Sequence, residues 1–133
     1  MTLVVDASVA AKWVLGEADS PRARALQAEG GLIAPSLIAA EVGNALWKAV
    51  RRDGIARQDA LDAIRTILLA FDALIPIEDL RLRALELSLD LNHPIYDCFY
   101  LALAERERAP LVCVDGRLQA KAKKLKSIQI RIL

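Results

Sequence analysis

Four acidic residues in apolar surroundings carry the strongest chemical signal in the sequence: Asp6, Glu41, Asp97 and Asp115. An ionised carboxylate that leaves water without a partner costs several kcal/mol or shifts its pKa until it is neutral. Four carboxylates in one cleft would also repel one another. A hard divalent cation such as Mg²⁺ or Mn²⁺ resolves both problems, because it takes oxygen ligands. The sequence therefore predicts a metal site built from these four side chains.

The elements that would position the acids alternate between short apolar strands and helices. We expect strands over residues 3–5, 32–34, 73–77, 111–114 and 128–132. We expect helices over residues 8–15, 20–28, 35–52, 57–71, 78–91, 95–108 and 116–124. This alternation predicts an α/β protein with a central, mostly parallel sheet of about four or five strands and helices on both faces.

Ligands of such sheets bind outside the carboxyl ends of the strands. Asp6 and Asp115 each end an expected strand, and Glu41 and Asp97 lie near the starts of helices that could face the same edge. The prediction of a metal site rests on the convergence of four residues from four segments. Each residue taken alone could instead have a structural role. Asp6 could cap the helix that follows it, and Asp115 could be a turn or cap residue.

Some local features lead to further expectations. Ser20 is expected to cap the second helix, and Glu78-Asp79 to cap the fifth, in which Leu82, Leu85 and Leu89 would form the apolar stripe. His93, the only histidine, could join the site one turn before Asp97, but a capping role before Pro94 is favoured.

Composition favours one domain, residues 1–133, with a large core. Hydrophobic residues make up 55% of the chain and its mean hydropathy is +0.30, yet no apolar run approaches the roughly 18 residues that span a bilayer. We interpret the excess as core plus apolar surface covered by a partner; a tightly packed monomer is the alternative. Without a signal-like start or metal-type cysteine spacing, Cys98 and Cys113 are expected to be buried thiols, and the protein cytoplasmic.

The net charge of +1 gives no general signal for a polyanionic partner, but residues 116–133 hold six basic residues and no acidic one. This basic end suits a metal enzyme acting on a phosphate polymer, although a solvated helix face explains it equally well. Lys12, Arg51 and Arg52 are further candidates for phosphate contacts. One histidine makes zinc catalysis improbable, and the glycine patterns of dinucleotide sites, P-loops and serine hydrolases are missing.

Four segments resemble a known family: Val5–Val9, Pro35–Leu46, Tyr96–Ala104 and Leu111–Asp115. Their residues and intervals are similar to those of PIN-domain ribonucleases, specifically VapC-type toxins of bacterial and archaeal toxin–antitoxin pairs. The resemblance implies a three-layer α/β/α PIN-like domain. It also implies an acidic metal pocket made of the four carboxylates, with Ser8 and Asn44 supporting it through hydrogen bonds. Two departures are Cys113, where the family often has Thr or Ser, and Gly116, where a larger residue is common.

The resemblance further implies a Mg²⁺-dependent endoribonuclease, with Mn²⁺ able to substitute, that hydrolyses RNA phosphodiester bonds with metal-activated water. Asp6 and Asp97 would be the main ligands, with Glu41 and Asp115 holding water or a second ion. The implied partners are a cognate VapB-type antitoxin and a second copy in a homodimer, with Trp47 or Phe71 at those surfaces. The alternatives are a PIN nuclease of RNA processing without an antitoxin, a non-catalytic α/β binding module and a metal-dependent phosphatase, whose usual Asp-x-Asp pair is missing.

Overall fold

A five-stranded, entirely parallel sheet forms the centre of the computed structural model, which describes residues 1–133. The strand order is β3-β2-β1-β4-β5. The strands are β1 (Thr2–Val5), β2 (Gly31–Pro35), β3 (Ala73–Ile75), β4 (Leu111–Cys113) and β5 (Ile130–Ile132). In the central strand, Val4 pairs with Ile33 on one side and with Leu111 on the other. The expected α/β architecture is confirmed, and the sheet is wholly rather than mostly parallel.

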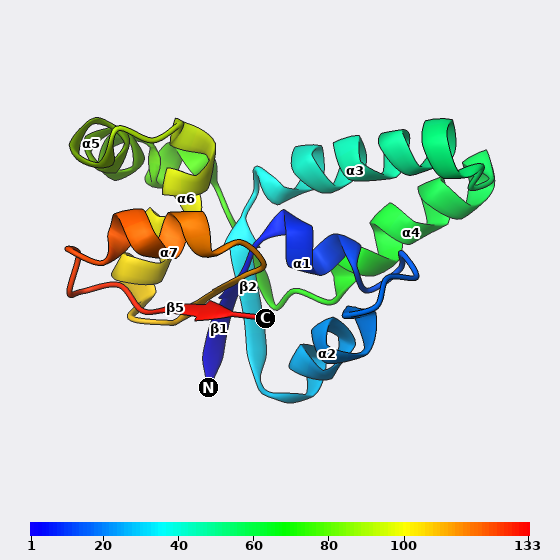
Figure 1. Ribbon diagram of the computed structural model, residues 1–133, viewed down its shortest axis with the longest axis horizontal. Helices are drawn as coiled ribbons and strands as arrows, with labels where there is room; N and C mark the ends of the chain where they lie inside the picture. Colours follow the sequence, from blue (N-terminus) through cyan, green and yellow to red (C-terminus); the bar gives the residue numbers. More distant parts are fainter.

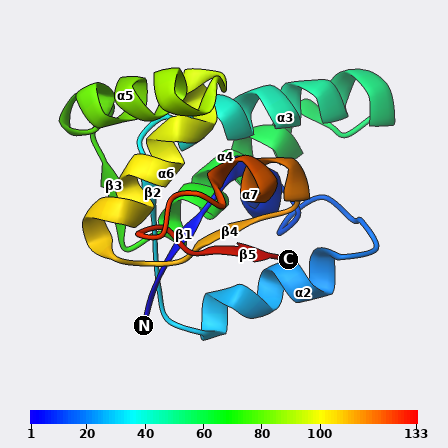
Figure 2. The ribbon, with the colours of Figure 1, turned by 60° about the vertical axis from the view of Figure 1, so that its left-hand side comes forward.

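Helices cover both faces of this sheet and give the three layers (Figure 1). The α-helices are α1 (Ala7–Ala11), α2 (Ser20–Ala25), α3 (Ile38–Asp53), α4 (Arg57–Leu69), α5 (Arg81–Leu91), α6 (Ile95–Glu107) and α7 (Gly116–Ala122). Two short 3₁₀ turns, η1 (Leu26–Ala28) and η2 (Ile77–Asp79), precede β2 and α5. In Figure 1, α5, α6 and α7 lie to the left of β1 and β2, whereas α1 to α4 lie to the right. Figure 2 shows α5 and α3 at the top of the molecule.

The strand order places a topological switch point between β1 and β4. From β1 the chain winds outward through β2 to β3, and it then returns to place β4 on the other side of β1. The connections that leave β1 and β4 therefore run to opposite faces, and a crevice opens between them at the carboxyl ends of the strands. Asp6 and Asp115 are the residues at the exits of these two strands.

The core is densest where α6 crosses the sheet. Seven successive residues of α6, Cys98 to Ala104, are buried, because the helix packs on β1 and β2 and is covered by α5. Arg83 of α5 fastens this pair of helices through a two-pronged ion pair with Glu105 of α6, with nitrogen–oxygen distances of 2.7 and 2.9 Å. A helix buried along its middle is a rigid support for the polar residues that it carries near its first turns.

The prediction that Leu82, Leu85 and Leu89 form the buried stripe of α5 is wrong. Leu82, Leu85 and Leu89 are 74%, 48% and 73% exposed, and the buried face carries Ala84, Leu87 and Leu91 instead. Both sets have helical spacing, so periodicity alone cannot decide which of them faces the core.

Two expected helix caps are also wrong. Ser20 is the first residue of α2, and its hydroxyl donates to the Leu15 carbonyl at 2.6 Å. Glu78 and Asp79 lie in a 3₁₀ turn, and the cap position of α5 is Leu80. The contact of Ser20 with the loop before α2, and the 3₁₀ turn before α5, cannot be read from the capping pattern.

Phe71 is not a surface residue, since it is 8% exposed and its ring centroid lies 5.5 Å from that of Trp13. Trp47 is 53% exposed, as expected of a residue at an interaction surface. Cys98 and Cys113 are buried free thiols, as expected. No helix is long and apolar enough to cross a membrane.

The turn before β2 depends on Gly30. A Cβ atom on Gly30 would lie 1.9 Å from the backbone oxygen of Met1, and that oxygen accepts the 2.9 Å hydrogen bond of the Gly31 amide. We expect Gly30→Ala to lower the free energy of unfolding by about 2 to 3 kcal/mol, measured by urea denaturation. Gly16→Ala is the matched control, because no atom lies within 4 Å of its Cβ position. Equal unfolding midpoints for the two variants would contradict this account of the turn.

Candidate active site

All four acidic residues line one cavity of about 210 Å³ in the crevice between β1 and β4. Its other lining residues are Ala7, Ser8, Tyr100, Cys113 and Leu118. The acids come from the exits of β1 and β4 and from the first turns of α3 and α6. Four segments distant in the sequence thus meet at the switch point of the sheet.

Asp6 combines a structural role with a place in the cavity. Its Oδ1 accepts hydrogen bonds from the Val9 amide at 3.0 Å and the Ser8 hydroxyl at 2.7 Å, so it caps α1. Its Oδ2 accepts no hydrogen bond from the protein. Burial raises the pKa of Asp6 to about 6 against the lowering effect of these two bonds, and the charges of Asp97 and Glu41 add to the rise. Keeping Asp6 ionised in this cavity therefore costs free energy, and a bound cation would offset that cost.

Glu41 faces the cavity from α3 and is held by α6. The Tyr100 hydroxyl donates to its Oε1 at 2.7 Å, and Tyr100 is only 2% exposed. Burial raises the pKa of Glu41, the Tyr100 hydrogen bond opposes the rise, and the charge of Asp97 adds to it. Burial and the neighbouring Glu41 also raise the pKa of Tyr100, which therefore remains a donor.

Asp97 is oriented by His93, which lies one helical turn earlier. His93 Nε2 lies 2.7 Å from Asp97 Oδ2, and His93 Nδ1 lies 3.2 Å from Lys121 Nζ of α7. Because a lysine ammonium group can only donate, Nδ1 must accept and Nε2 carries the hydrogen donated to Asp97. The favoured capping role of His93 is wrong: Pro94 is the cap residue of α6, with no side-chain cap bond.

Asp115 differs from the other three acids because one neighbouring residue, Arg117, donates hydrogen bonds to both of its oxygens. Its Oδ1 accepts from the Arg117 amide at 2.8 Å, and its Oδ2 accepts from the Arg117 guanidinium at 2.7 Å. These hydrogen bonds keep the pKa of Asp115 below its usual value. Asp115 thereby caps α7, which is the ordinary role considered for it.

The donor set suits a hard divalent cation. Asp6, Glu41 and Asp97 each give one carboxylate oxygen to a protein donor and keep the other free of protein hydrogen bonds. No three of the acids converge on one point as a complete ligand set. A cation would have to draw the free oxygens together, and recruiting Asp115 would require its separation from Arg117. Mg²⁺ and Mn²⁺ nonetheless prefer oxygen ligands, and their charge would offset the repulsion among these carboxylates.

The two expected supporting residues lie in different places. Ser8 donates to Asp6 as described, whereas Asn44 makes no hydrogen bond with any of the four carboxylates. Asn44 is exposed one turn after Glu41, in a groove that adjoins the cavity. The prediction that Asn44 supports the carboxylates through a hydrogen bond is therefore wrong, and its side chain lines the adjoining groove instead.

Sequence reasoning missed Tyr100 as a residue of the cavity, which Cys113 also lines. The signal for Tyr100 was available, since it follows Asp97 by three positions and lies on the same side of the helix. Burial raises the pKa of Cys113 to about 12, and the nearby acids Asp6, Asp97 and Asp115 contribute. Cys113 is consequently a neutral thiol in this cavity at neutral pH.

Comparison with known proteins agrees with this architecture: the model of the PIN domain family matches residues 3–124. The chain belongs to the PIN-domain family. It is 34% identical to ribonuclease VapC3 of Pyrobaculum aerophilum over 125 residues, which cover 91% of this chain and 95% of that protein. It is 35% identical to ribonuclease VapC1 of Mycobacterium tuberculosis over 120 residues, or 88% of each chain.

The fold also matches a solved toxin–antitoxin structure. The crystal structure of VapBC2 from Rickettsia felis bound to a promoter DNA fragment superposes with a TM-score of 0.72, covering 100% of this chain and 99% of that chain. At 14% identity this likeness shows the fold alone. The resemblance to VapC-type PIN domains and the three-layer PIN fold are confirmed.

The raised pKa of Asp6 makes stability depend on pH. The folded protein holds a proton on Asp6 up to a pKa of about 6, whereas the ordinary value is 3.8, so stability without metal should fall as pH rises from about 4 to about 6. We expect Asp6→Asn, which keeps a cap acceptor for α1, to stabilise the protein by about 2 kcal/mol at pH 8 and to have little effect at pH 4. Urea unfolding in EDTA measures both values.

Asp115→Asn is the control for this prediction. The pKa of Asp115 is lowered, so its contribution has the opposite sign and is lost as pH falls. Asp115→Asn should destabilise the protein at neutral pH. A destabilising effect of Asp6→Asn at pH 8 would refute the electrostatic account of Asp6.

Proposed function

We propose that this protein is a Mg²⁺-dependent endoribonuclease that acts as the toxin of a toxin–antitoxin pair, with Mn²⁺ able to replace Mg²⁺. The observation that carries the proposal is the single cavity in which Asp6, Glu41 and Asp97 each present one oxygen without a protein hydrogen bond. The names of the PIN-domain relatives, ribonucleases VapC3 and VapC1, support RNA as the substrate. An RNA substrate in turn supports a cytoplasmic site of action for this single domain.

Asp6 and Asp97 are proposed as the main metal ligands, with Glu41 beside them. Ser8, Tyr100 and His93 keep the three carboxylates oriented, because each donates a hydrogen bond to one oxygen and leaves the other for the metal. Asp115 is proposed to hold water or a second ion once it separates from Arg117. When bound, the metal supplies Lewis acidity, which activates water and offsets charge on the phosphate oxygens.

The proposed reaction is hydrolysis of an RNA phosphodiester bond. A water oxygen bonds to phosphorus, the bond from phosphorus to the 3′ oxygen breaks, and the leaving 3′ oxygen takes a proton from solvent water. The products carry 5′-phosphate and 3′-hydroxyl ends. Glu41 is suited to accept the proton of the attacking water, because it lines the cavity and its second carboxylate oxygen accepts no hydrogen bond from the protein.

The proposed partners are a VapB-type antitoxin and a second copy of this chain. The match to the fold of a VapBC2 complex supports the first. The exposed leucines of α5 support an apolar surface that a partner covers, since Leu82, Leu85 and Leu89 form one stripe of the helix. We propose that this stripe contributes to a homodimer.

The nuclease is tested by incubating antitoxin-free protein with total cellular RNA and Mg²⁺ or Mn²⁺, beside an EDTA control. We expect discrete fragments with metal only, and a loss of at least about 100-fold in rate for Asp97→Asn. Asp59→Asn, at an exposed position of α4, is the matched control and should cut like the wild type. Mn²⁺ binding, followed by electron paramagnetic resonance, should be weakened by Asp97→Asn and unchanged by Asp59→Asn. Cleavage that persists in EDTA would sink the proposal.

The role of His93 has its own test. His93→Ala removes the donor that orients Asp97, and we expect Mn²⁺ affinity to fall about 10-fold. His93→Gln can restore an N–H group near the position of Nε2, so it should recover part of the affinity. Equal Mn²⁺ affinities for wild type and His93→Ala would show that Asp97 needs no such orientation.

A further inference from the structure

A groove of about 470 Å³ leads away from the carboxylate cavity along α3. It shares Ala7, Ser8 and Glu41 with the cavity, so the two hollows are continuous. Its floor continues to Asn44 and Lys48 of α3, and Tyr96 of α6 also lines it. A ligand that enters the cavity can therefore extend along this groove.

The groove continues into a basic hollow at the end of α3. Lys48 lines both the groove and this second hollow, whose other residues are Trp47, Arg51 and Arg52. Glu41, Asn44, Lys48, and then both Arg51 and Arg52, follow one another at intervals of three or four residues and so form one stripe of the helix. From Glu41 to Arg52 this stripe rises by roughly 16 Å, which is long enough for several nucleotides.

The cations of this stripe are free to bind a ligand. Lys48, Arg51 and Arg52 take part in none of the ion pairs of the structure, unlike three basic residues elsewhere in the chain. Lys12 pairs with Glu17 and Asp19, Arg117 pairs with Asp115, and Arg131 pairs with Glu29. Lys12 is thus a poor phosphate contact, and part of the basic end of the chain is already engaged.

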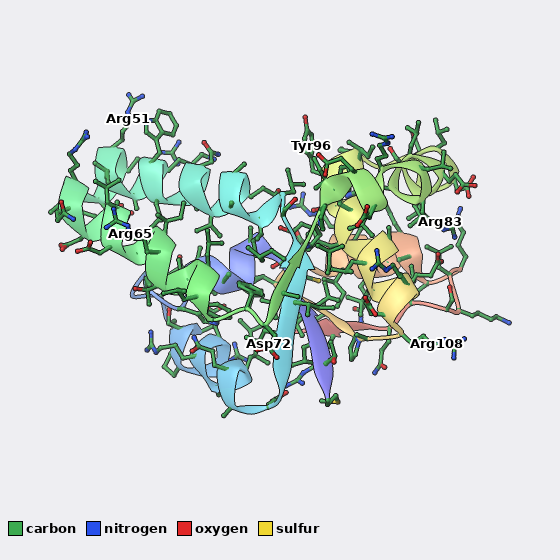
Figure 3. All side chains as sticks on the ribbon, turned by 180° about the vertical axis from the view of Figure 1, so that it is seen from behind. Arg51, Arg65, Asp72, Arg83, Tyr96 and Arg108 are labelled. Atoms are coloured by element: carbon green, nitrogen blue, oxygen red, sulfur yellow. The ribbon has the colours of Figure 1, made fainter.

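The two exposed aromatic rings of the protein lie beside the same stripe. Tyr96 is 60% exposed and Trp47 is 53% exposed, whereas the remaining tryptophan, tyrosine and two phenylalanines are buried. The Arg51 guanidinium carbon lies 5.1 Å from the centroid of the Trp47 ring. Figure 3 shows Tyr96 and Arg51 extending from the same side of the molecule, at opposite ends of α3.

We propose that this path, from the cavity past Tyr96 to Trp47, Arg51 and Arg52, binds single-stranded RNA on one side of the cleaved bond. Unpaired bases stack on the two rings, and Lys48, Arg51 and Arg52 contact phosphates. Aromatic rings interleaved with unpaired cations are the combination that binds single strands without sequence preference. This inference rests on the proposed ribonuclease function and adds where, and in which form, the RNA lies.

The polar face of α3 favours RNA over a protein segment. The other side of the helix and α4 line a hollow of mostly apolar residues, among them Leu46, Leu61 and Ile64. Trp47 lies at the border and lines both this hollow and the basic one. An amphipathic protein segment would take that side, where apolar area can be buried. The stripe of Asn44, Lys48, Arg51 and Arg52 has no apolar residue and suits a polyanion.

Binding is measured with a fluorescein-labelled single-stranded RNA of 12 mixed nucleotides, by fluorescence anisotropy of the full chain in EDTA, which prevents cleavage. We expect Trp47→Ala to raise Kd about 10-fold and Trp47→Phe to keep most of the affinity. Arg51→Gln with Arg52→Gln should make the slope of log K against log salt less steep by about 1.4, since each phosphate contact contributes about 0.7. A 12-base-pair RNA duplex should not distinguish Trp47→Ala from the wild type.

Arg22→Gln with Arg24→Gln is the matched control, because it removes two exposed charges of α2 that form no ion pair and lie away from the stripe. Its Kd should stay within about twofold of the wild-type value. With Mn²⁺ present, the Trp47 and Arg51–Arg52 variants should raise KM and leave kcat unchanged. Circular dichroism verifies that each variant is folded.

The outcomes separate this inference from the proposed function. Wild-type protein that cleaves RNA while the stripe variants bind RNA normally would overturn the path and leave the nuclease standing. Stripe variants that keep RNA affinity but lose an antitoxin would show a protein interface, which also overturns it. Stripe variants that lose RNA affinity in a protein that cuts no RNA would support the path and refute the nuclease. Wild-type protein that neither binds nor cuts RNA would refute both.

Discussion

Repulsion among carboxylates that share one small cavity is the constraint on which the rest of the structure depends. Burial raises the pKa of Asp6 and of Glu41, and the nearby charge of Asp97 adds to the rise of both. A fold that merely gathered these acids would protonate them or push them apart. Here each acid is fixed through one oxygen by a donor from the protein. The other oxygen of each carboxylate accepts no hydrogen bond from the protein, so together these oxygens attract a cation.

The donors come from parts of the fold that cannot move independently. Ser8 and Val9 belong to the first turn of α1, directly after the central strand. Tyr100 lies on α6, the most deeply buried helix, and reaches Glu41 across the crevice. Lys121 of α7 sets the hydrogen position on His93, so α7 influences Asp97 although it contributes no group to that carboxylate. The two faces of the sheet are thus joined by hydrogen bonds at the one edge where the chain reverses its winding.

The sequence supports prediction of the strands, the parallel sheet and the four acids, because these features depend on local composition and order. Leu111-Val112-Cys113 can only be a buried strand in this context, and Asp97 opens a helix too apolar for the surface. Features that depend on side-chain direction were not predictable. Leu82, Leu85 and Leu89 have the same spacing as the residues that α5 buries, and only the packing of α5 on α6 decides between the two faces. The contact from His93 to Asp97 and the capture of Asp115 by Arg117 likewise depend on rotamers, which spacing does not specify.

The net charge of +1 conceals a separation of charge along a single helix. Near its start, α3 contributes Glu41 to an acidic cavity, and near its end it carries Lys48, Arg51 and Arg52 on the same stripe. The acidic cavity repels a polyanion until a cation is bound there. The basic residues at the other end of α3 attract a polyanion whether or not the cation is bound. The basic end can therefore hold a phosphate chain before the acidic end has been neutralised, and the two ends act in sequence rather than in competition. Since one rigid helix of 16 residues joins them, the spacing between the two is fixed by the helical rise and does not depend on loop motion.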